Sequence, residues 1–253
     1  MRDLTYPPVI LAAKASFRAL GLRVQVSGSE HIPRRGGAVL AINHISYIDF
    51  IVAGYATQPA GRLVRFMAKR ELFEHRISGP LMRSLHHINV DREDGTGSYD
   101  TALDYLAQGE VVGLFPEATI SRSFEIKELK TGTVRMAAKA DVPLIPMVLW
   151  GSQRIYTKGH PRDLSRGKCV TASIGAPLQM TGSPVADTAA LRDQMRGLLE
   201  HAVNSYPQAE DHAWWVPQSH GGTAPSVEQA RATERAEARA RAEERRAARS
   251  EAS

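Results

Sequence analysis

The sequence has 253 residues, of which 43% are hydrophobic and 23% charged, and its formal net charge is +5. This length and hydrophobic content support a large globular core, which excludes an intrinsically disordered chain. Cys169 is the only cysteine, which excludes an internal disulfide and a cysteine metal cluster, and no histidine spacing matches a metal-ligand motif. The positive charge favours an anionic partner, which could be nucleic acid, a phosphorylated metabolite or an acidic membrane surface.

Residues 1–22 are predicted to form an amphipathic helix. Apolar residues recur at helical spacing at Tyr6, Val9, Ala13, Phe17 and Leu20, and Lys14 and Arg18 fall on the other side. The segment lacks the cleavage site of a secretory signal peptide, so we expect it on the mature protein. Two interpretations stay open: the helix packs on its own domain, or it lies in a membrane interface. No apolar run approaches the roughly 20 residues that cross a bilayer.

The stretch INHISYIDF at 42–50 places His44 and Asp49 five positions apart in an apolar run. One interpretation is a capping box, because Ser46 and Asp49 fit the pattern S-x-x-D at a helix start. The other is proton chemistry, in which Asp49 accepts the ring N–H of His44 and leaves the second ring nitrogen as a base. The two interpretations are compatible with each other.

The remainder of the body alternates strand-like apolar runs with helix-like segments. The predicted strands are 38–42, 62–68, 87–90, 110–115, 143–150 and 169–175, and the predicted helices are 46–57, 77–85, 97–108, 131–140 and 185–203. This alternation predicts an α/β fold, with residues 23–206 forming a single domain around a mixed, largely buried sheet flanked by helices.

The C-terminal region changes composition after Trp215. Residues 207–227 are predicted to be a linker, and residues 228–253 are almost entirely Ala, Arg and Glu. The tail has no large apolar stripe, so we expect it to be disordered or a solitary helix. Its seven arginines nearly balance its six glutamates, so it is a poor candidate for a nucleic-acid arm.

Polar side chains follow several predicted strands, which is where open α/β sheets build their sites. Arg92 follows the strand near 87–90, and Glu117, Thr119 and Arg122 follow the strand at 110–115. Such a cationic, hydroxyl-rich rim is suited to a phosphate group, which arginine binds through charge-assisted, bidentate hydrogen bonds.

Four sequence blocks resemble those of the 1-acylglycerol-3-phosphate acyltransferases and their glycerolipid acyltransferase relatives. The blocks cover about residues 25–180 and appear in the family's order. They are N-H-x-x-x-x-D at Asn43, His44 and Asp49, an apolar strand with a final arginine at 88–92, F-P-E-A-T-I-S at 115–121, and V-P-x-x-P at Val142, Pro143 and Pro146.

This resemblance implies transfer of a fatty acyl chain from acyl-CoA or acyl carrier protein to the free hydroxyl of 1-acylglycerol 3-phosphate. His44 would be the general base and Asp49 would orient it, while Arg92, Glu117 and Thr119 would serve the acceptor. Glycerol 3-phosphate, another lysophospholipid or a glycolipid stay open as acceptors. We expect no metal or other cofactor, no nucleic acid, and a peripheral location at the cytoplasmic face of the cell membrane.

Two positions depart from the family pattern, and both lie in the third block. Ala118 replaces the usual glycine, and Ile120 stands where the family generally has an arginine. Arg122 is a candidate to replace that charge, and Lys130, just before a predicted helix start, is a second candidate for binding phosphate. A remote alternative is a peripheral membrane-binding protein that has kept the fold without catalysis.

Overall fold

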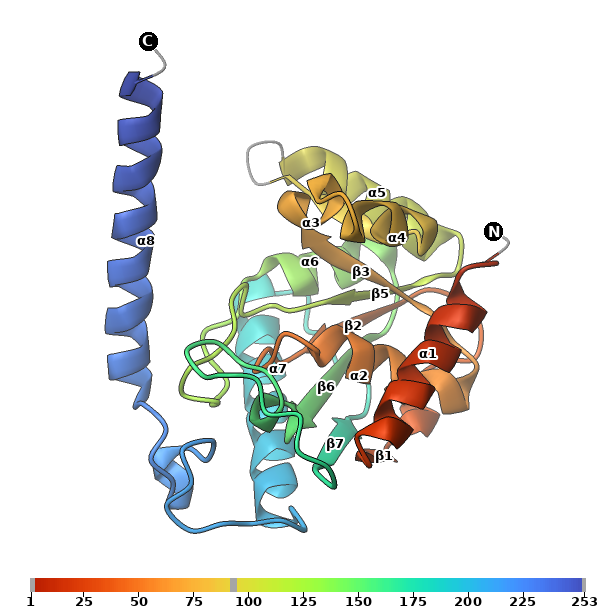
Figure 1. Cartoon of the computed structure of the whole chain (residues 1–253). Coiled ribbons are helices and arrows are strands. Elements are labelled where there is room, and N and C mark those ends of the chain that lie inside the picture. The colour runs from red at the N-terminus through yellow and green to blue at the C-terminus, as the bar shows by residue number, and fades with distance from the viewer. Residues whose placement is uncertain (1–2, 92–94, 252–253) are drawn as a thin grey trace.

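The central strands are rich in Val, Ile and Leu, because helices bury both faces of the sheet that they form. The computed structural model describes residues 3–91 and 95–251 (Figure 1). The strands are β1 (Arg23–Ser27), β2 (Ala38–Ile42), β3 (Val64–Lys69), β4 (Ile88–Val90), β5 (Val111–Leu114), β6 (Leu144–Trp150) and β7 (Cys169–Ile174). The α-helices are α1 (Tyr6–Ala19), α2 (Asp49–Ala56), α3 (Arg70–Glu74), α4 (Ser78–Ser84), α5 (Gly95–Ala107), α6 (Gly132–Ala140), α7 (Pro184–Asn204) and α8 (Val227–Glu251).

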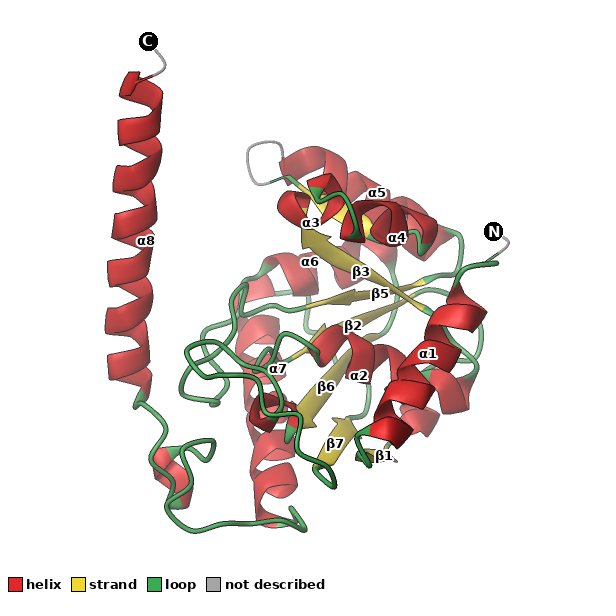
Figure 2. Ribbon diagram, viewed as in Figure 1, coloured by secondary structure: helices red, strands yellow, loops and turns green. Residues whose placement is uncertain are grey.

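The seven strands form one mixed sheet in the order β1-β7-β6-β2-β5-β3-β4 (Figure 2). Neighbouring strands pair in parallel, except β6 and β7, which run antiparallel. Alternate residues of β2 face opposite sides: Val39 and Ala41 pack with α5, α6 and α7, whereas Leu40 and Ile42 pack with α1 and α2. The predicted α/β fold with a mixed, buried sheet is therefore confirmed.

Two elements escaped the sequence prediction. β1 is short, lies at the edge of the sheet, and alternates exposed with half-buried residues. α3 has only five residues, which is too short for a helical pattern to emerge. The six predicted strands and the helices of the body are present with shifted ends.

The N-terminal helix α1 packs on its own domain. Tyr6 and Phe17 are buried, the Tyr6 hydroxyl donates to the Val64 carbonyl, and Phe17 meets Tyr55 edge to face at a centroid distance of 5.4 Å. The predicted apolar face is thus occupied by the body of the protein. Leu11 is 69% exposed on the outer face, so membrane association of residues 1–22 stays a prediction that rests on that outer face.

The C-terminal tail is helical, one of the two forms expected for it, and the segment before it packs on the body. Within 207–227, Trp215, Val216 and Ala224 are buried, and the indoles of Trp150 and Trp215 lie 6.1 Å apart between ring centroids. Aromatic packing therefore fastens this segment to the body. α8 follows as a helix and stands at the side of the domain (Figure 1).

Candidate active site

Three loops meet at the edge of the sheet where β2, β5 and β6 end. They comprise residues 43–48, 115–131 and 151–168. Because these strands are parallel neighbours, their carboxyl ends lie together. Backbone bonds join the loops: the Ser121 N–H donates to the His44 carbonyl at 2.7 Å. Apart from Arg92, which lies outside the described residues, all the predicted site residues are in these loops or at the start of α2.

His44 and Asp49 form the predicted pair. The distance from His44 Nδ1 to Asp49 Oδ2 is 3.0 Å, and the Asp49 side chain is fully buried while that of His44 is 22% exposed. The His44 ring stacks on Phe115 with 4.2 Å between ring centroids. Since Asp49 engages Nδ1, Nε2 is the ring nitrogen left to exchange a proton with a bound molecule.

Asp49 is held by donors from two loops. Its Oδ2 accepts the N–H groups of Ile45 and Ser46, both at 2.7 Å, and its Oδ1 accepts the Ser152 hydroxyl at 2.7 Å. These bonds fix the carboxylate that faces His44. Ser152 was not predicted from sequence because it follows β6, far along the chain from Asp49.

The capping-box interpretation is only half right. α2 begins at Asp49 with Ile48 as its N-cap, and no side chain caps it. The Asp49 carboxylate does reach back to the Ser46 N–H, but the Ser46 hydroxyl donates to the Tyr156 carbonyl at 2.6 Å. The carboxylate therefore serves the loop and His44 rather than a capped helix.

Glu117 binds backbone groups on both sides of the site. Its Oε1 accepts the His44 N–H at 3.0 Å, and its Oε2 accepts the Lys127 N–H at 3.3 Å. Burial raises the pKa of the Glu117 carboxyl to about 7, against the opposing effects of the His44 N–H and the Lys127 charge. These contacts position His44, and a contribution of Glu117 to the acceptor stays a prediction.

The other predicted substrate-binding residues have different surroundings. Thr119 Oγ1 accepts from Lys127 Nζ at 2.6 Å, and Arg122 pairs with Glu237 of α8. Lys130 is exposed, and its backbone N–H donates to the Pro116 carbonyl at 3.0 Å. Lys127 is buried next to Thr119 and was missed, although it lies between the third block and the start of α6.

The departures from the family pattern have structural consequences. Ala118 has a φ of 63°, a left-handed conformation that glycine adopts without the strain of a Cβ atom. Ile120 is 6% exposed and packs as an apolar residue, so no charge stands at that position. Arg122, two residues later, is the nearest cation that follows it in the loop.

The comparisons with known proteins identify the family of this chain. The sequence profile of the family described as Acyltransferase matches residues 23–150. The chain belongs to the acyltransferase family. The family inferred from the four sequence blocks is therefore confirmed.

Several acyltransferases share part of their length with this chain. The 1-acyl-sn-glycerol-3-phosphate acyltransferase of Bacillus subtilis is 34% identical over 140 residues, which cover 54% of this chain and 68% of the relative. The 1-acyl-sn-glycerol-3-phosphate acyltransferase alpha of Mus musculus is 32% identical over 181 residues, or 70% of this chain and 62% of the relative. The aligned part of the relative from Limnanthes douglasii is 49% of its length.

One solved acyltransferase has a similar fold. The crystal structure of the 1-acyl-sn-glycerophosphate (LPA) acyltransferase PlsC from Thermotoga maritima superposes with a TM-score of 0.65 and 23% identity. The match covers 81% of each chain. At this identity the likeness concerns the fold alone.

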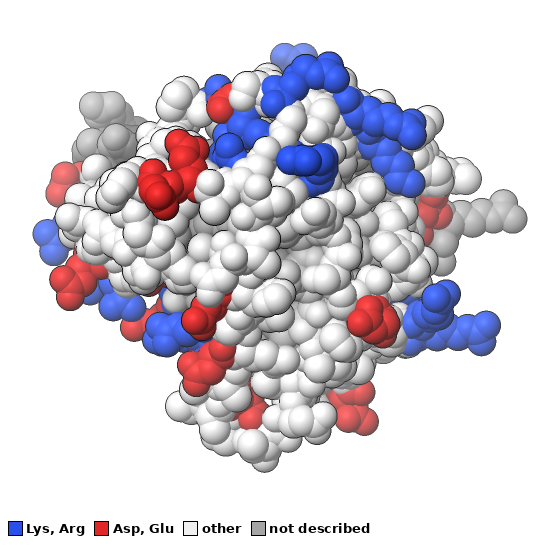
Figure 3. Space-filling view, turned by 90° about the horizontal axis from the view of Figure 1, so that it is seen from below, with Lys and Arg blue, Asp and Glu red and all other residues white. Residues whose placement is uncertain are grey.

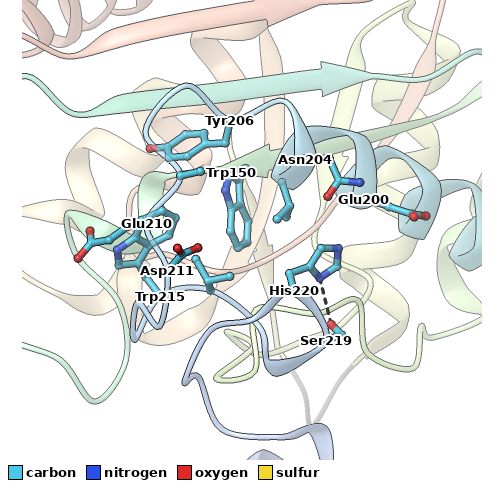
Figure 4. A pocket seen from close by; sticks show the side chains of 12 residues that line it. Trp150, Glu200, Asn204, Tyr206, Glu210, Asp211, Trp215, Ser219 and His220 are labelled. Atoms are coloured by element: carbon cyan, nitrogen blue, oxygen red, sulfur yellow. Dashed lines mark hydrogen bonds between the residues drawn. The ribbon is translucent and has the colours of Figure 1, made fainter.

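A separate cavity of about 480 Å³ lies between the end of α7 and residues 206–220 (Figure 4). Trp150 lines it together with carboxylates from Glu200, Glu210 and Asp211. None of the predicted site residues lines this cavity. Its carboxylates would repel a phosphate, so it is a poor candidate for binding a phosphorylated acceptor.

The surface of the acyltransferase shows an uneven charge distribution. On the face seen in Figure 3, Lys and Arg gather towards one margin, whereas the middle carries few charged side chains. Within residues 3–91 and 95–251, no helix is both long and apolar enough to cross a membrane.

Proposed function

We propose that this protein transfers a fatty acyl chain from a thioester to the free hydroxyl of 1-acylglycerol 3-phosphate, giving phosphatidate for phospholipid synthesis. The pairing of half-buried His44 with buried Asp49 carries the proposal. The names of the relatives from Bacillus subtilis and Mus musculus support this choice of acceptor.

In the proposed reaction His44 Nε2 removes the proton of the acceptor hydroxyl as its oxygen attacks the thioester carbonyl carbon. Asp49 holds the ring through Nδ1 and stabilises the imidazolium that forms. When the tetrahedral intermediate collapses, the new ester C–O bond is kept, the C–S bond breaks, and His44 returns the proton to the departing thiolate. These steps need two substrates and protein side chains, so we propose no cofactor.

The acyl donor is proposed to be acyl-CoA or acyl carrier protein. Both present the same thioester on a phosphopantetheine arm, and the described contacts around His44 favour neither. The arm is attached to a nucleotide in CoA and to a protein in acyl carrier protein, so parallel assays with each donor will show which one the enzyme uses.

We further propose that the enzyme works at the cytoplasmic surface of a membrane. Tyr47 and Phe50, on either side of Asp49 in the sequence, are 43% and 42% exposed, and Leu72, Ile77 and Leu81 are exposed on α3, α4 and the turn between them. Exposed apolar side chains beside a site for a lipid acceptor are suited to contact with acyl chains.

The test uses purified protein, labelled acyl-CoA or acyl carrier protein, and a panel of acceptors with products resolved by mass. We expect phosphatidate with 1-acylglycerol 3-phosphate as the preferred acceptor. His44→Ala should fold normally and lose on the order of 10²- to 10⁴-fold in kcat, the usual contribution of a positioned base. His44→Gln, which cannot accept the proton at neutral pH, should lose as much. Near-normal turnover in folded His44→Ala protein would contradict the mechanism.

A further inference from the structure

One face of α8 contacts the loops of the candidate site. Val227, Ala230, Arg231, Glu234 and Glu237 are buried or half-buried, whereas the residues between them are exposed. This spacing of three and four marks a single helical face. Of the later residues whose burial is described, those at 238–240 and 243 are all exposed, so the described contact face lies in the first turns of the helix.

The contacts on this face are mainly ionic. Glu234 accepts from Lys127 Nζ at 2.9 Å, and Glu237 pairs with both Arg122 and Lys158. Ala230 is the only residue of α8 that is fully buried among those whose burial is described. Arg231 adds an ion pair with Glu128 at 2.8 Å, so the helix is held against the loops by ion pairs more than by apolar packing.

We call Arg122, Lys127 and Lys158 the basic triad; its members come from the two loops that flank the loop of the proposed base. Lys127 is linked to His44 through Glu117, which accepts the backbone N–H of each. Lys158 comes from loop 151–168, which also supplies the Thr157 hydroxyl that donates to the Ile45 carbonyl at 2.6 Å. The triad thus borders the loops that carry His44.

The surroundings of Arg122 suit an anion with more oxygen atoms than a carboxylate. Its Nε is buried and has no hydrogen-bond partner in the structure, although its guanidinium pairs with Glu237. Gly159, at φ +84°, lies beneath it: a Cβ there would come within 2.5 Å of Arg122 Nη1. A phosphate could accept from the fork of Arg122 and from a lysine at the same time.

We infer that the basic triad is a phosphate-binding subsite and that Glu234 and Glu237 occupy it until a phosphate-bearing substrate displaces α8. The inference rests on the proposed function for the identity of that substrate. Two carboxylates carry a charge of −2, and a phosphate monoester carries about −1.5 to −2 at neutral pH, so the exchange leaves the negative charge bound to the triad nearly unchanged. α8 would then act as an internal competitor of the substrate.

The kinetic test compares two double variants with the same change in net charge. Glu234→Gln/Glu237→Gln removes the carboxylates that bind the triad, and Glu228→Gln/Glu243→Gln removes two exposed carboxylates of the same helix. The first should lower the KM of one substrate by on the order of tenfold, because the competitor is weakened. The second should leave KM unchanged. An unchanged or raised KM in the first variant would overturn the inference.

A second test does not depend on catalysis. Trypsin cleaves after Arg231, Arg235 and Arg239 of α8, and fragments are identified by mass. Glycerol 3-phosphate represents the acceptor phosphate and CoA represents the donor phosphates. We expect one of them to speed these cleavages in the wild-type protein beyond a sodium chloride control of equal ionic strength, and the effective probe names the source of the phosphate. If neither does, the triad is not the subsite, whether or not the protein proves to be an acyltransferase.

Discussion

Two cationic clusters at opposite edges of the sheet are neutralised in different ways. At the amino ends of β3 and β5, fully buried Arg65 makes a bidentate pair with Asp3 at 2.8 Å and a second pair with Glu110 at 3.2 Å. At the carboxyl ends, the basic triad is paired by carboxylates of α8. In both cases a terminal segment outside the central sheet supplies at least one acid, Asp3 at the first and α8 at the second.

The supports of the two acids differ. Beside Asp3, α1 buries Tyr6 and Phe17, and the Arg65 guanidinium lies 5.3 Å from the centre of the Tyr6 ring. Beside Glu234 and Glu237, Ala230 is the one fully buried residue among those of α8 whose burial is described. Apolar anchoring makes the first cluster a permanent part of the fold, whereas the second depends on exchangeable ionic contacts. Similar ion pairs therefore have a structural role at one edge and a proposed ligand-responsive role at the other.

The largest expected effect separates the two arginines. Arg65→Met should lower the free energy of unfolding by on the order of 3 kcal/mol, because Asp3 and Glu110 lose a buried partner. Activity per folded molecule should stay unchanged, since Arg65 is remote from His44. Arg122→Met should cost less than about 1 kcal/mol, because its ion pair is partly exposed. Urea unfolding of both variants measures the two free energies of unfolding. Equal decreases would contradict the proposed difference between the two clusters.

The acids at the two edges should respond to pH in opposite directions. A hydrogen bond from Arg65 lowers the pKa of the Asp3 carboxyl, so its stabilisation is present above the unfolded pKa and lost as pH falls. Burial raises the pKa of Glu117 to about 7 from an ordinary value of 4.5, so its contribution is fully present below about pH 4.5 and lost as pH rises through about 7.

From about pH 5 to about pH 7.5, Glu117 should therefore reduce the free energy of unfolding by about 2 kcal/mol. Denaturation of the wild type and Glu117→Gln across this interval measures it. The variant should show a flatter dependence, because it has no carboxyl to ionise. Parallel curves for the two proteins would mean that Glu117 does not titrate there.

The smallest effect concerns backbone strain. Ala118→Gly should raise the free energy of unfolding by about 0.5–1 kcal/mol, because the residue has a φ of 63° and is exposed. Gly109, at φ +82° just before β5, is the matched position at the other edge, and Gly109→Ala should lower stability by a similar amount. Thermal melting of both variants decides; destabilisation by Ala118→Gly would show that the strain is absent.

The sequence contained most of the sheet and the central pair of the site. The central strands could be predicted because short, continuous apolar runs are typical of buried strands. The pair of His44 and Asp49 could be predicted because both residues belong to one short sequence block. Ser152 and Lys158 were invisible, since only the parallel pairing of β6 with β2 places loop 151–168 beside the loop that carries His44. The docking of α8 was also hidden, because Ala, Arg and Glu recur on all its faces and only the folded partner selects Glu234 and Glu237.

The reversal of direction between β6 and β7 has a consequence for engineering. Loop 151–168 leaves the sheet and returns to it at the same edge, so its length and sequence can change without moving a strand out of register. Lys158 and Gly159 lie in its middle, between the Asp49 contact of Ser152 and the start of β7. Exchanging this segment for those of relatives, while keeping Ser152 and Thr157, therefore changes the surroundings of Lys158 on an unchanged scaffold.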